Sequence, residues 1–182
     1  MTSRKPGPHP YVNRLWKAAY ARASFRYVKD VCDYILKEQI QPKDTFYPLM
    51  TPICVLYARP FKRSKGIESL TLQFVPKKFH YLHEELILFR DQMIAHVDAK
   101  GAQFKGLPAN TVGVAVRDGQ ATFGVQEVKF KITTISQIRE LASDLVERMN
   151  EYVDKLGSQY PNDVPQDGDY LIDLTTGTLR RL

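Results

Sequence analysis

Residues 134–156 place apolar side chains at helical spacing along their whole length, and no other feature of the sequence constrains the fold as strongly. The pattern predicts an amphipathic helix with one long apolar face. Thr134 and Gln137 have the spacing of a capping box at its start, and Gly157 is a usual C-terminal stop. The apolar face holds Ile138, Leu141, Leu145, Met149, Tyr152 and Leu156.

A second long helix is predicted over residues 11–41. Apolar groups recur there at helical spacing, and Pro42 is expected to stop the helix because proline disfavours the helical conformation of the residue before it. The length of the segment leaves room for a kink near Ala23 and Ser24.

Two more segments complete the helical pattern. Residues 44–63 are strongly apolar but rich in proline, so we expect an irregular buried helix with Asp44 as N-cap and a kink at Pro52. Residues 77–98 predict the next helix. The fold class is therefore expected to be mainly α, a helical bundle of about four long helices.

Residues 111–131 change to the period of β-strands. Valines alternate with other residues from Val112 to Val116, and Asp118-Gly119 is a dipeptide favoured in two-residue hairpin turns. The sequence therefore predicts a small β-hairpin inserted into the helical bundle.

The two ends of the chain have a different character from the middle. Residues 1–10 are basic and proline-rich, which predicts a flexible N-terminus and no secretory signal. Residues 158–182 form a tail that closes with "DYLIDLTTG", a short strand expected to join the hairpin. With 182 residues in all, we expect a single domain spanning residues 1–182.

The composition is that of an ordinary globular protein, 43% hydrophobic and 25% charged, which argues against global disorder. No apolar run approaches the roughly 20 residues needed to cross a bilayer, so no membrane partner is expected. Cys32 and Cys54 lie among apolar residues of predicted helices and are expected to be buried free thiols. They form no disulfide framework and no zinc spacing, and we expect a cytoplasmic protein.

Positive charge is concentrated in the first third of the chain. Residues 1–65 hold 13 Lys and Arg against 4 Asp and Glu, and the net charge of the whole chain is +6. Four of these cations cluster around Phe61 in "ARPFKRSKG", and an aromatic-containing basic patch suits an RNA backbone. It is equally typical of a solvated helix end. The candidate RNA-binding residues are Arg59, Lys62, Arg63 and Lys65.

His80 and His83 are three residues apart in "HYLHEE" near a predicted helix start. This spacing puts both rings on one helix face, but the motif lacks the order of a metalloprotease helix and has no third ligand nearby. We therefore expect a polar helix surface there and no metal site. The chain also has no glycine-rich phosphate loop and no nucleophile elbow, and no cofactor is predicted.

Three polar residues stand in the otherwise apolar stretch "ELILFRDQMIAHVD": Arg90, Asp91 and His96. On a helical wheel Arg90 and His96 flank a narrow apolar stripe about 120° apart and about 9 Å apart along the axis, while Asp91 points away from it. One straight helix places the two groups poorly for a single ligand. A second copy of the helix, packed stripe to stripe in a twofold dimer, would bring them together.

The run "FRDQMIAHVD" resembles the signature of the HEPN superfamily, an arginine followed by a polar residue and then, a few positions on, a histidine. Asp91 fills the polar position, Ala95 precedes the histidine as is common, and the run looks especially like HEPN proteins of the abortive-infection type. With its helix-rich setting, the resemblance covers approximately residues 11–157. It implies an HEPN-like helical bundle.

The resemblance also implies a function: a metal-independent endoribonuclease, a toxin or phage-defence effector, with a composite site formed by a homodimer. His96 would then be the general base or acid for attack of an RNA 2′-OH on the adjacent phosphate. Arg90 would stabilise the transition-state charge, and Asp91 would orient Arg90 or a group of the second subunit. RNA and an antitoxin protein are the implied partners.

One position departs from the family pattern. HEPN toxins silenced by a nucleotidyltransferase antitoxin often carry a tyrosine two residues after the histidine, and this chain has Asp98 there. Silencing by modification at that tyrosine is therefore not expected. Two alternatives stay open: a non-catalytic HEPN-like module that binds RNA or a protein, and a structural helix with Arg90 and His96 at its rim.

Overall fold

The computed structural model describes residues 10–40, 46–63, 69–91, 103–104, 107–108, 112–125, 130–158, 168–173, 176 and 178–182. Over these residues the fold is mainly α-helical, as predicted, with α1 (Pro10–Lys37), α2 (Phe46–Ala58), α3 (His80–Phe89) and α4 (Ile132–Gly157). Short 3-10 turns are η1 (Arg59–Phe61), η2 (Leu72–Phe74) and η3 (Lys77–Phe79). The strands are β1 (Gln103–Phe104), β2 (Leu107–Pro108), β3 (Val112–Arg117), β4 (Gln120–Val125), β5 (Tyr170–Ile172) and β6 (Leu179–Arg181).

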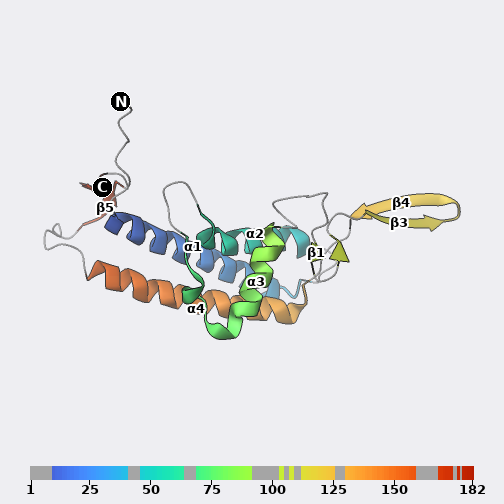
Figure 1. Ribbon diagram of the computed structural model, residues 1–182, viewed down its shortest axis with the longest axis horizontal. Helices are drawn as coiled ribbons and strands as arrows, with labels where there is room; N and C mark the ends of the chain where they lie inside the picture. The colour runs from blue at the N-terminus through green and yellow to red at the C-terminus, as the bar shows by residue number, and fades with distance from the viewer. Residues whose placement is uncertain are drawn as a thin grey trace, which may run out of the picture.

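The two longest helices, α1 and α4, lie side by side and run antiparallel along the long axis of the molecule (Figure 1). Each buries one face in the same core. Asp33 of α1 also accepts hydrogen bonds from Arg139 of α4 and, at 2.7 Å, from Lys29. The Arg139 hydrogen bond, reinforced by that from Lys29, holds the pKa of Asp33 below its usual value. From α4 the core receives Ile135, Ile138, Leu141, Ala142, Leu145 and Met149.

α2 packs on α1, and α3 packs on α2. Pro52 lies inside α2, and the helix continues past it to Ala58. Cys32 of α1 and Cys54 of α2 are fully buried free thiols, which confirms the prediction. Burial raises the pKa of Cys32 to about 12 and also raises that of Cys54.

Helix ends are where the sequence prediction was wrong. α1 is continuous through Ala23 and Ser24 but ends at Lys37, well before Pro42, and the chain then turns at Gln39 with a positive φ of 50°. The predicted capping box of α4 is also wrong, because Lys131 is the N-cap and makes no side-chain cap, while Thr134 lies within the first turn. Gly157 ends α4 as predicted.

The β-hairpin is confirmed over the described part of 111–131. β3 and β4 pair in antiparallel register, and Asp118 and Gly119 both have positive φ, 51° and 76°, as a type I′ turn requires. The hairpin projects from one end of the helical body (Figure 1).

The tail differs from its prediction. β5 pairs with β6 and not with the β3–β4 hairpin, so the C-terminal residues form a small hairpin of their own. The reason is local: Asp173 accepts hydrogen bonds from the backbone and hydroxyl of Thr176, which turn the chain back on itself.

Several predictions concern residues outside the described part of the chain. They are the N-terminus to residue 9, Asp44 as N-cap and the helix beyond Asp91. Within the described residues, no helix combines the length and the hydropathy that crossing a bilayer requires.

The packing of α4 leads to a stability prediction. Leu141→Ala is expected to lower the free energy of unfolding by about 2–5 kcal/mol, because it leaves a cavity at a fully buried position. Glu147→Ala, on the exposed side of the same helix, is expected to change it by no more than about 0.5 kcal/mol. Urea denaturation followed by circular dichroism measures both, and equal effects would contradict the assignment of the buried face.

Candidate functional site at the end of α3

The predicted motif begins where α3 changes its geometry. The α-helix ends at Phe89, and Arg90 and Asp91 lie in a π-helical turn directly after it. Such turns are rare and are often found at functional sites. Leu82, Leu86 and Phe89 are buried in the core of a single copy of the protein. The expected packing of this stripe against a second copy of the helix is therefore wrong for its described half, which instead agrees with the alternative of a core helix with Arg90 at its rim.

Arg90 and Asp91 are half-buried and form an ion pair, with Nη1 of Arg90 donating to Oδ1 of Asp91 at 2.9 Å. The second carboxylate oxygen, Oδ2, accepts a hydrogen bond from Nζ of Lys62. Burial would raise the pKa of Asp91, but the hydrogen bonds from Lys62 and Arg90 outweigh it and hold the pKa below its usual value. Asp91 is therefore an anion that bridges two cations.

Asp91 joins two groups that are far apart in the sequence. Lys62 belongs to the basic patch after α2, whereas Arg90 belongs to the motif after α3. Asp91, which the helical wheel directed away from the apolar stripe, meets Lys62 there. We call Lys62, Arg90 and Asp91 the bridged cluster; its two cations outnumber its single carboxylate.

Arg59 of the basic patch contacts a different helix from Lys62. It begins η1, in which the next residue, Pro60, is buried. The guanidinium of Arg59 lies 4.7 Å above the ring of Tyr20 in α1, and that ring stacks on Trp16 at 4.9 Å. Arg63 is exposed, and Lys65 lies outside the described residues. The structure thus places Lys62 beside the motif and Arg59 on an aromatic surface of α1.

The third residue of the motif, His96, also lies outside the described part of the chain, so the structure brings together Arg90 and Asp91 only. Two groups of the described cluster can bind a phosphate oxygen: the half-exposed guanidinium of Arg90, which Asp91 orients, and the nearby ammonium of Lys62.

The prediction that "HYLHEE" is a polar helix surface was wrong for His83. This histidine is buried, and its Nδ1 lies 2.8 Å from the hydroxyl of Tyr57 in α2. Its ring also packs edge-to-face with that of Phe61, with the ring centroids 4.6 Å apart. Burial, helped by the positive charges of His80 and Lys62, lowers the pKa of His83 to about 4, so the ring is neutral near pH 7.

His80 is separate from this pair, with its Nε2 3.1 Å from the backbone oxygen of Val75. Among the residues that the structure describes, no three or more His, Cys, Asp or Glu side chains are grouped so as to hold a metal ion. His83 therefore acts as a packing and hydrogen-bonding residue. Its weak basicity makes it unsuitable as a general base at neutral pH.

His83 predicts a pH dependence of stability. The pKa is about 4 in the folded protein and about 6.5 in the unfolded chain, so the unfolded state binds more protons between these values. The free energy of unfolding should therefore fall as the pH decreases from about 6.5 to 4, by at most about 1.4 kcal/mol per pH unit from this group.

Urea denaturation at a series of pH values measures this slope. His83→Gln keeps a hydrogen-bonding side chain but cannot titrate, so its slope should be smaller than that of the wild type. His80→Gln serves as the matched histidine control and should keep most of the dependence, because burial is the largest cause of the shift at His83 and the charge of His80 is a smaller one. Identical slopes in wild type and His83→Gln would show that His83 does not cause the dependence.

Comparisons with known proteins identify no relative: no family model matches the sequence, and no curated protein and no solved structure matches it.

Proposed function

We propose that the protein is a metal-independent endoribonuclease of the HEPN type, a toxin or phage-defence effector, whose site is shared by the two subunits of a homodimer. The observation that carries the proposal is the bridged cluster. Asp91 links Arg90, the first residue of the HEPN-like motif, to Lys62 of the basic patch. A phosphate held by Lys62 would thereby lie beside the motif.

The chemistry assigned to the motif is transesterification of RNA. His96 takes the proton of a 2′-OH, the 2′ oxygen forms a bond to the adjacent phosphorus, and the bond from phosphorus to the 5′ oxygen breaks. The products are a 2′,3′-cyclic phosphate and a 5′-OH that receives a proton. Arg90 stabilises the negative charge on the phosphate oxygens during this step.

Asp91 is a positioning residue in this proposal. The hydrogen bond that it accepts from Nη1 of Arg90 fixes the guanidinium, and the one that it accepts from Lys62 keeps the basic segment near the motif. Because its pKa is held low, the carboxylate stays ionised throughout the neutral range.

Incubation of the protein with single-stranded RNA in EDTA tests the activity. We expect cleavage that persists without metal, leaves 2′,3′-cyclic phosphate ends and is abolished in His96→Ala. Arg90→Ala should lower the rate by about 10²–10³-fold, the usual cost of losing one charge-stabilising donor. Arg148→Ala, an exposed arginine of α4, is the matched control and should leave the rate unchanged.

Full activity in His96→Ala would overturn the catalytic assignment. Asp91→Asn provides a finer test, because it removes the charge but keeps the size of the side chain. If Asp91 acts by positioning, this variant should lower kcat more than it raises KM.

A second candidate is a non-catalytic module that binds RNA, and one observation favours it. Arg59 over Tyr20, stacked in turn on Trp16, combines a cation with aromatic rings, as surfaces that bind single-stranded nucleic acid do. If binding is the whole function, RNA affinity should fall steeply with salt and weaken in Arg59→Ala, yet be unaffected in His96→Ala. Fluorescence anisotropy with a labelled RNA measures the affinity. Cleavage of RNA by the wild type would exclude a function limited to binding.

A further inference from the structure

The charged side chains of two neighbouring segments, residues 10–29 and 46–63, are all positive. The first segment contains five Lys and Arg and the second contains three, and neither contains an Asp or Glu. The first forms most of α1, and the second forms α2 and η1, which pack on α1 (Figure 1). Two of the eight cations, Lys29 and Lys62, are paired with carboxylates of other segments. The remaining excess of positive charge suits a polyanion.

Aromatic side chains form a stripe along this part of α1. On a helix with 3.6 residues per turn, Trp16, Tyr20 and Tyr27 lie within about 40° of one another. The rings of Trp16 and Tyr20 stack with their centroids 4.9 Å apart, and the guanidinium of Arg59 lies 4.7 Å from the centroid of Tyr20. Tyr27 follows about 10 Å further along the helix axis. It is 51% exposed, so a flat group can stack on its ring.

Cations lie on both sides of the stripe. Relative to Tyr20 on the helical wheel, Lys17 lies about 60° to one side and Arg26 about 120° to the other. Arg26 is exposed and directly precedes Tyr27. Rings that stack with bases, flanked by cations that contact phosphates, are how proteins bind single-stranded nucleic acid. We call the following residues the α1–η1 surface: Trp16, Tyr20, Arg26, Tyr27 and Arg59.

The aromatic stripe continues to Tyr34, but the charge around it changes there. Tyr34 is 53% exposed, almost as much as Tyr27. Asp30 lies one turn before it, and the backbone N–H of Glu38 donates to its backbone oxygen at 3.0 Å. Lys37 is paired with Glu38 at 3.8 Å. Because carboxylates repel phosphates, the surface suited to a polyanion ends between Tyr27 and Tyr34.

The α1–η1 surface is connected to the bridged cluster through η1. Arg59 begins η1 and contacts Tyr20, whereas Lys62 directly follows η1 and contacts Asp91. A 3-10 turn rises about 2 Å per residue, so the backbone positions of Arg59 and Lys62 are about 6 Å apart. A strand with one phosphate at Lys62 therefore reaches Arg59 within a few nucleotides.

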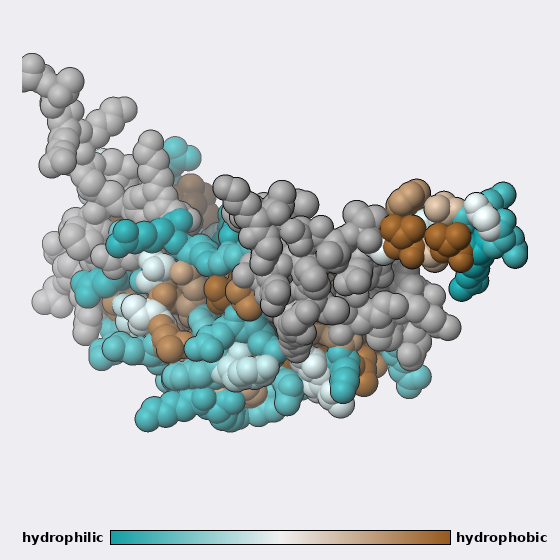
Figure 2. All heavy atoms as spheres, turned by 45° about the vertical axis from the view of Figure 1, so that its right-hand side comes forward, coloured by the Kyte–Doolittle hydropathy of each residue, from teal (hydrophilic) through white to brown (hydrophobic). Residues whose placement is uncertain are grey.

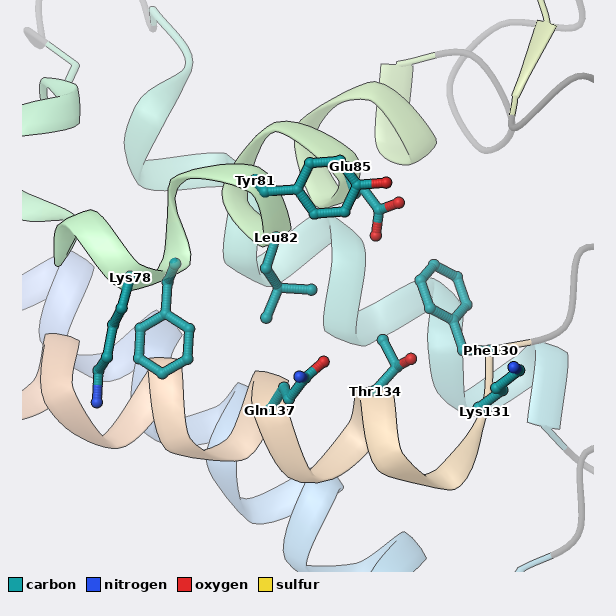
Figure 3. A pocket seen from close by; sticks show the side chains of 9 residues that line it. Lys78, Tyr81, Leu82, Glu85, Phe130, Lys131, Thr134 and Gln137 are labelled. Atoms are coloured by element: carbon teal, nitrogen blue, oxygen red, sulfur yellow. The ribbon is translucent and has the colours of Figure 1, made fainter.

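The cleft between α3 and the start of α4 is less suited to a polyanion. It has a volume of about 500 Å³, with Lys78 at one end, Lys131 at the other and Glu85 between them (Figure 3). Lys78 is already paired with Glu140 at 2.7 Å and with Asp144 at 3.4 Å. The carboxylates in and around the cleft therefore offset its cations.

The β3–β4 hairpin is also unsuited to a polyanion. It presents strongly apolar side chains on its projecting surface (Figure 2), and Val116 is 68% and Phe123 72% exposed. Its two strands and turn, residues 112–125, hold one cation, Arg117, and one carboxylate, Asp118. The hairpin therefore has no net charge, and the α1–η1 surface remains the best match to a nucleic acid.

We infer that the α1–η1 surface is an exosite for single-stranded RNA, a binding site away from the reacting atoms. A base stacks on Tyr27, Arg26 and Arg59 contact phosphates, and the strand continues from Arg59 to Lys62 of the bridged cluster. A duplex is excluded because its bases are not free to stack on protein rings. The choice of RNA as the ligand rests on the proposed function, but binding at this surface does not require cleavage.

Substitutions of two tyrosines test the exosite. The probe is a short labelled oligouridine with 2′-O-methyl groups, which cannot be cleaved by attack of a 2′-OH, and fluorescence anisotropy measures its binding. Tyr27→Ala is expected to weaken binding by about 5–100-fold, the usual loss when a stacking ring is removed. Tyr27→Phe keeps the ring and should bind as the wild type does. Tyr34→Ala, at an equally exposed tyrosine among carboxylates, is the matched control and should also bind as the wild type does.

The salt dependence of binding separates stacking from contacts with phosphates. Each phosphate neutralised on a single strand contributes about 0.7 to the slope of log Kd against log salt concentration. Arg59→Ala should therefore reduce this slope by about 0.7, whereas Tyr27→Ala should weaken binding and leave the slope unchanged. Annealing the probe to oligoadenosine should weaken binding by about tenfold or more, because its bases then pair and stack within the duplex.

Four results would overturn the exosite. They are binding by Tyr27→Ala as tight as that of the wild type, equal losses in Tyr27→Ala and Tyr34→Ala, tighter binding of the duplex than of the single strand, and no binding by the wild type at about 100 µM protein. Circular dichroism confirms that each variant folds.

The exosite and the ribonuclease activity can fail separately. With a cleavable RNA, Tyr27→Ala should raise KM and leave kcat unchanged, because Tyr27 contacts no reacting atom. Cleavage by the wild type with no contribution of Tyr27 to binding would overturn the exosite alone. Binding of the probe that depends on Tyr27, in a protein that cleaves no RNA, would support the exosite and contradict the ribonuclease.

Discussion

The pairing of α1 with α4 is the constraint on which the rest of the structure depends. α4 buries six residues in the core, and α1 supplies the facing surface, which includes Phe25, Val28, Cys32 and Ile35. The ion pair of Asp33 with Arg139 lies at the rim of this contact, where exposed charges contribute little free energy. Apolar burial therefore holds the two helices together, while α2 packs on α1 and α3 packs on α2.

The bridged cluster is positioned by η1, the short segment that packs against α1 and α3. η1 follows α2, and its Phe61 packs against Phe25 of α1 and His83 of α3, while the backbone oxygen of Pro60 accepts a hydrogen bond from Leu70. These contacts fix the segment, so that Lys62 reaches Asp91 and Arg59 reaches Tyr20. The position of the bridged cluster is thus a consequence of the packing of Phe61 against Phe25 and His83.

The features that the sequence could predict are those that depend on neighbouring residues. Asp118-Gly119 defines its turn by itself, and the apolar repeat of α4 defines the buried face whatever packs on it. His83 was misjudged because its partner Tyr57 comes from another helix, and no local pattern pairs them. Lys62 and Asp91 are 29 positions apart, so their contact follows only from the tertiary packing. The helix ends were predicted wrongly for a smaller reason. α1 is followed by a backbone turn with positive φ at Gln39, and α4 begins after Lys131, an extended N-cap residue that makes no side-chain cap.

The two buried thiols have a consequence for how motions of this molecule can be observed. Thiolates are the reactive form of cysteine, and the raised pKa of Cys32, about 12, leaves almost none of it at neutral pH in the closed core. Alkylation of Cys32 and Cys54 then proceeds only through openings that expose α1 or α2. Cys32 in α1 and Cys54 in α2 therefore report local unfolding of two neighbouring helices. The ratio of their alkylation rates reveals whether α2 detaches from the core before α1 and α4 separate.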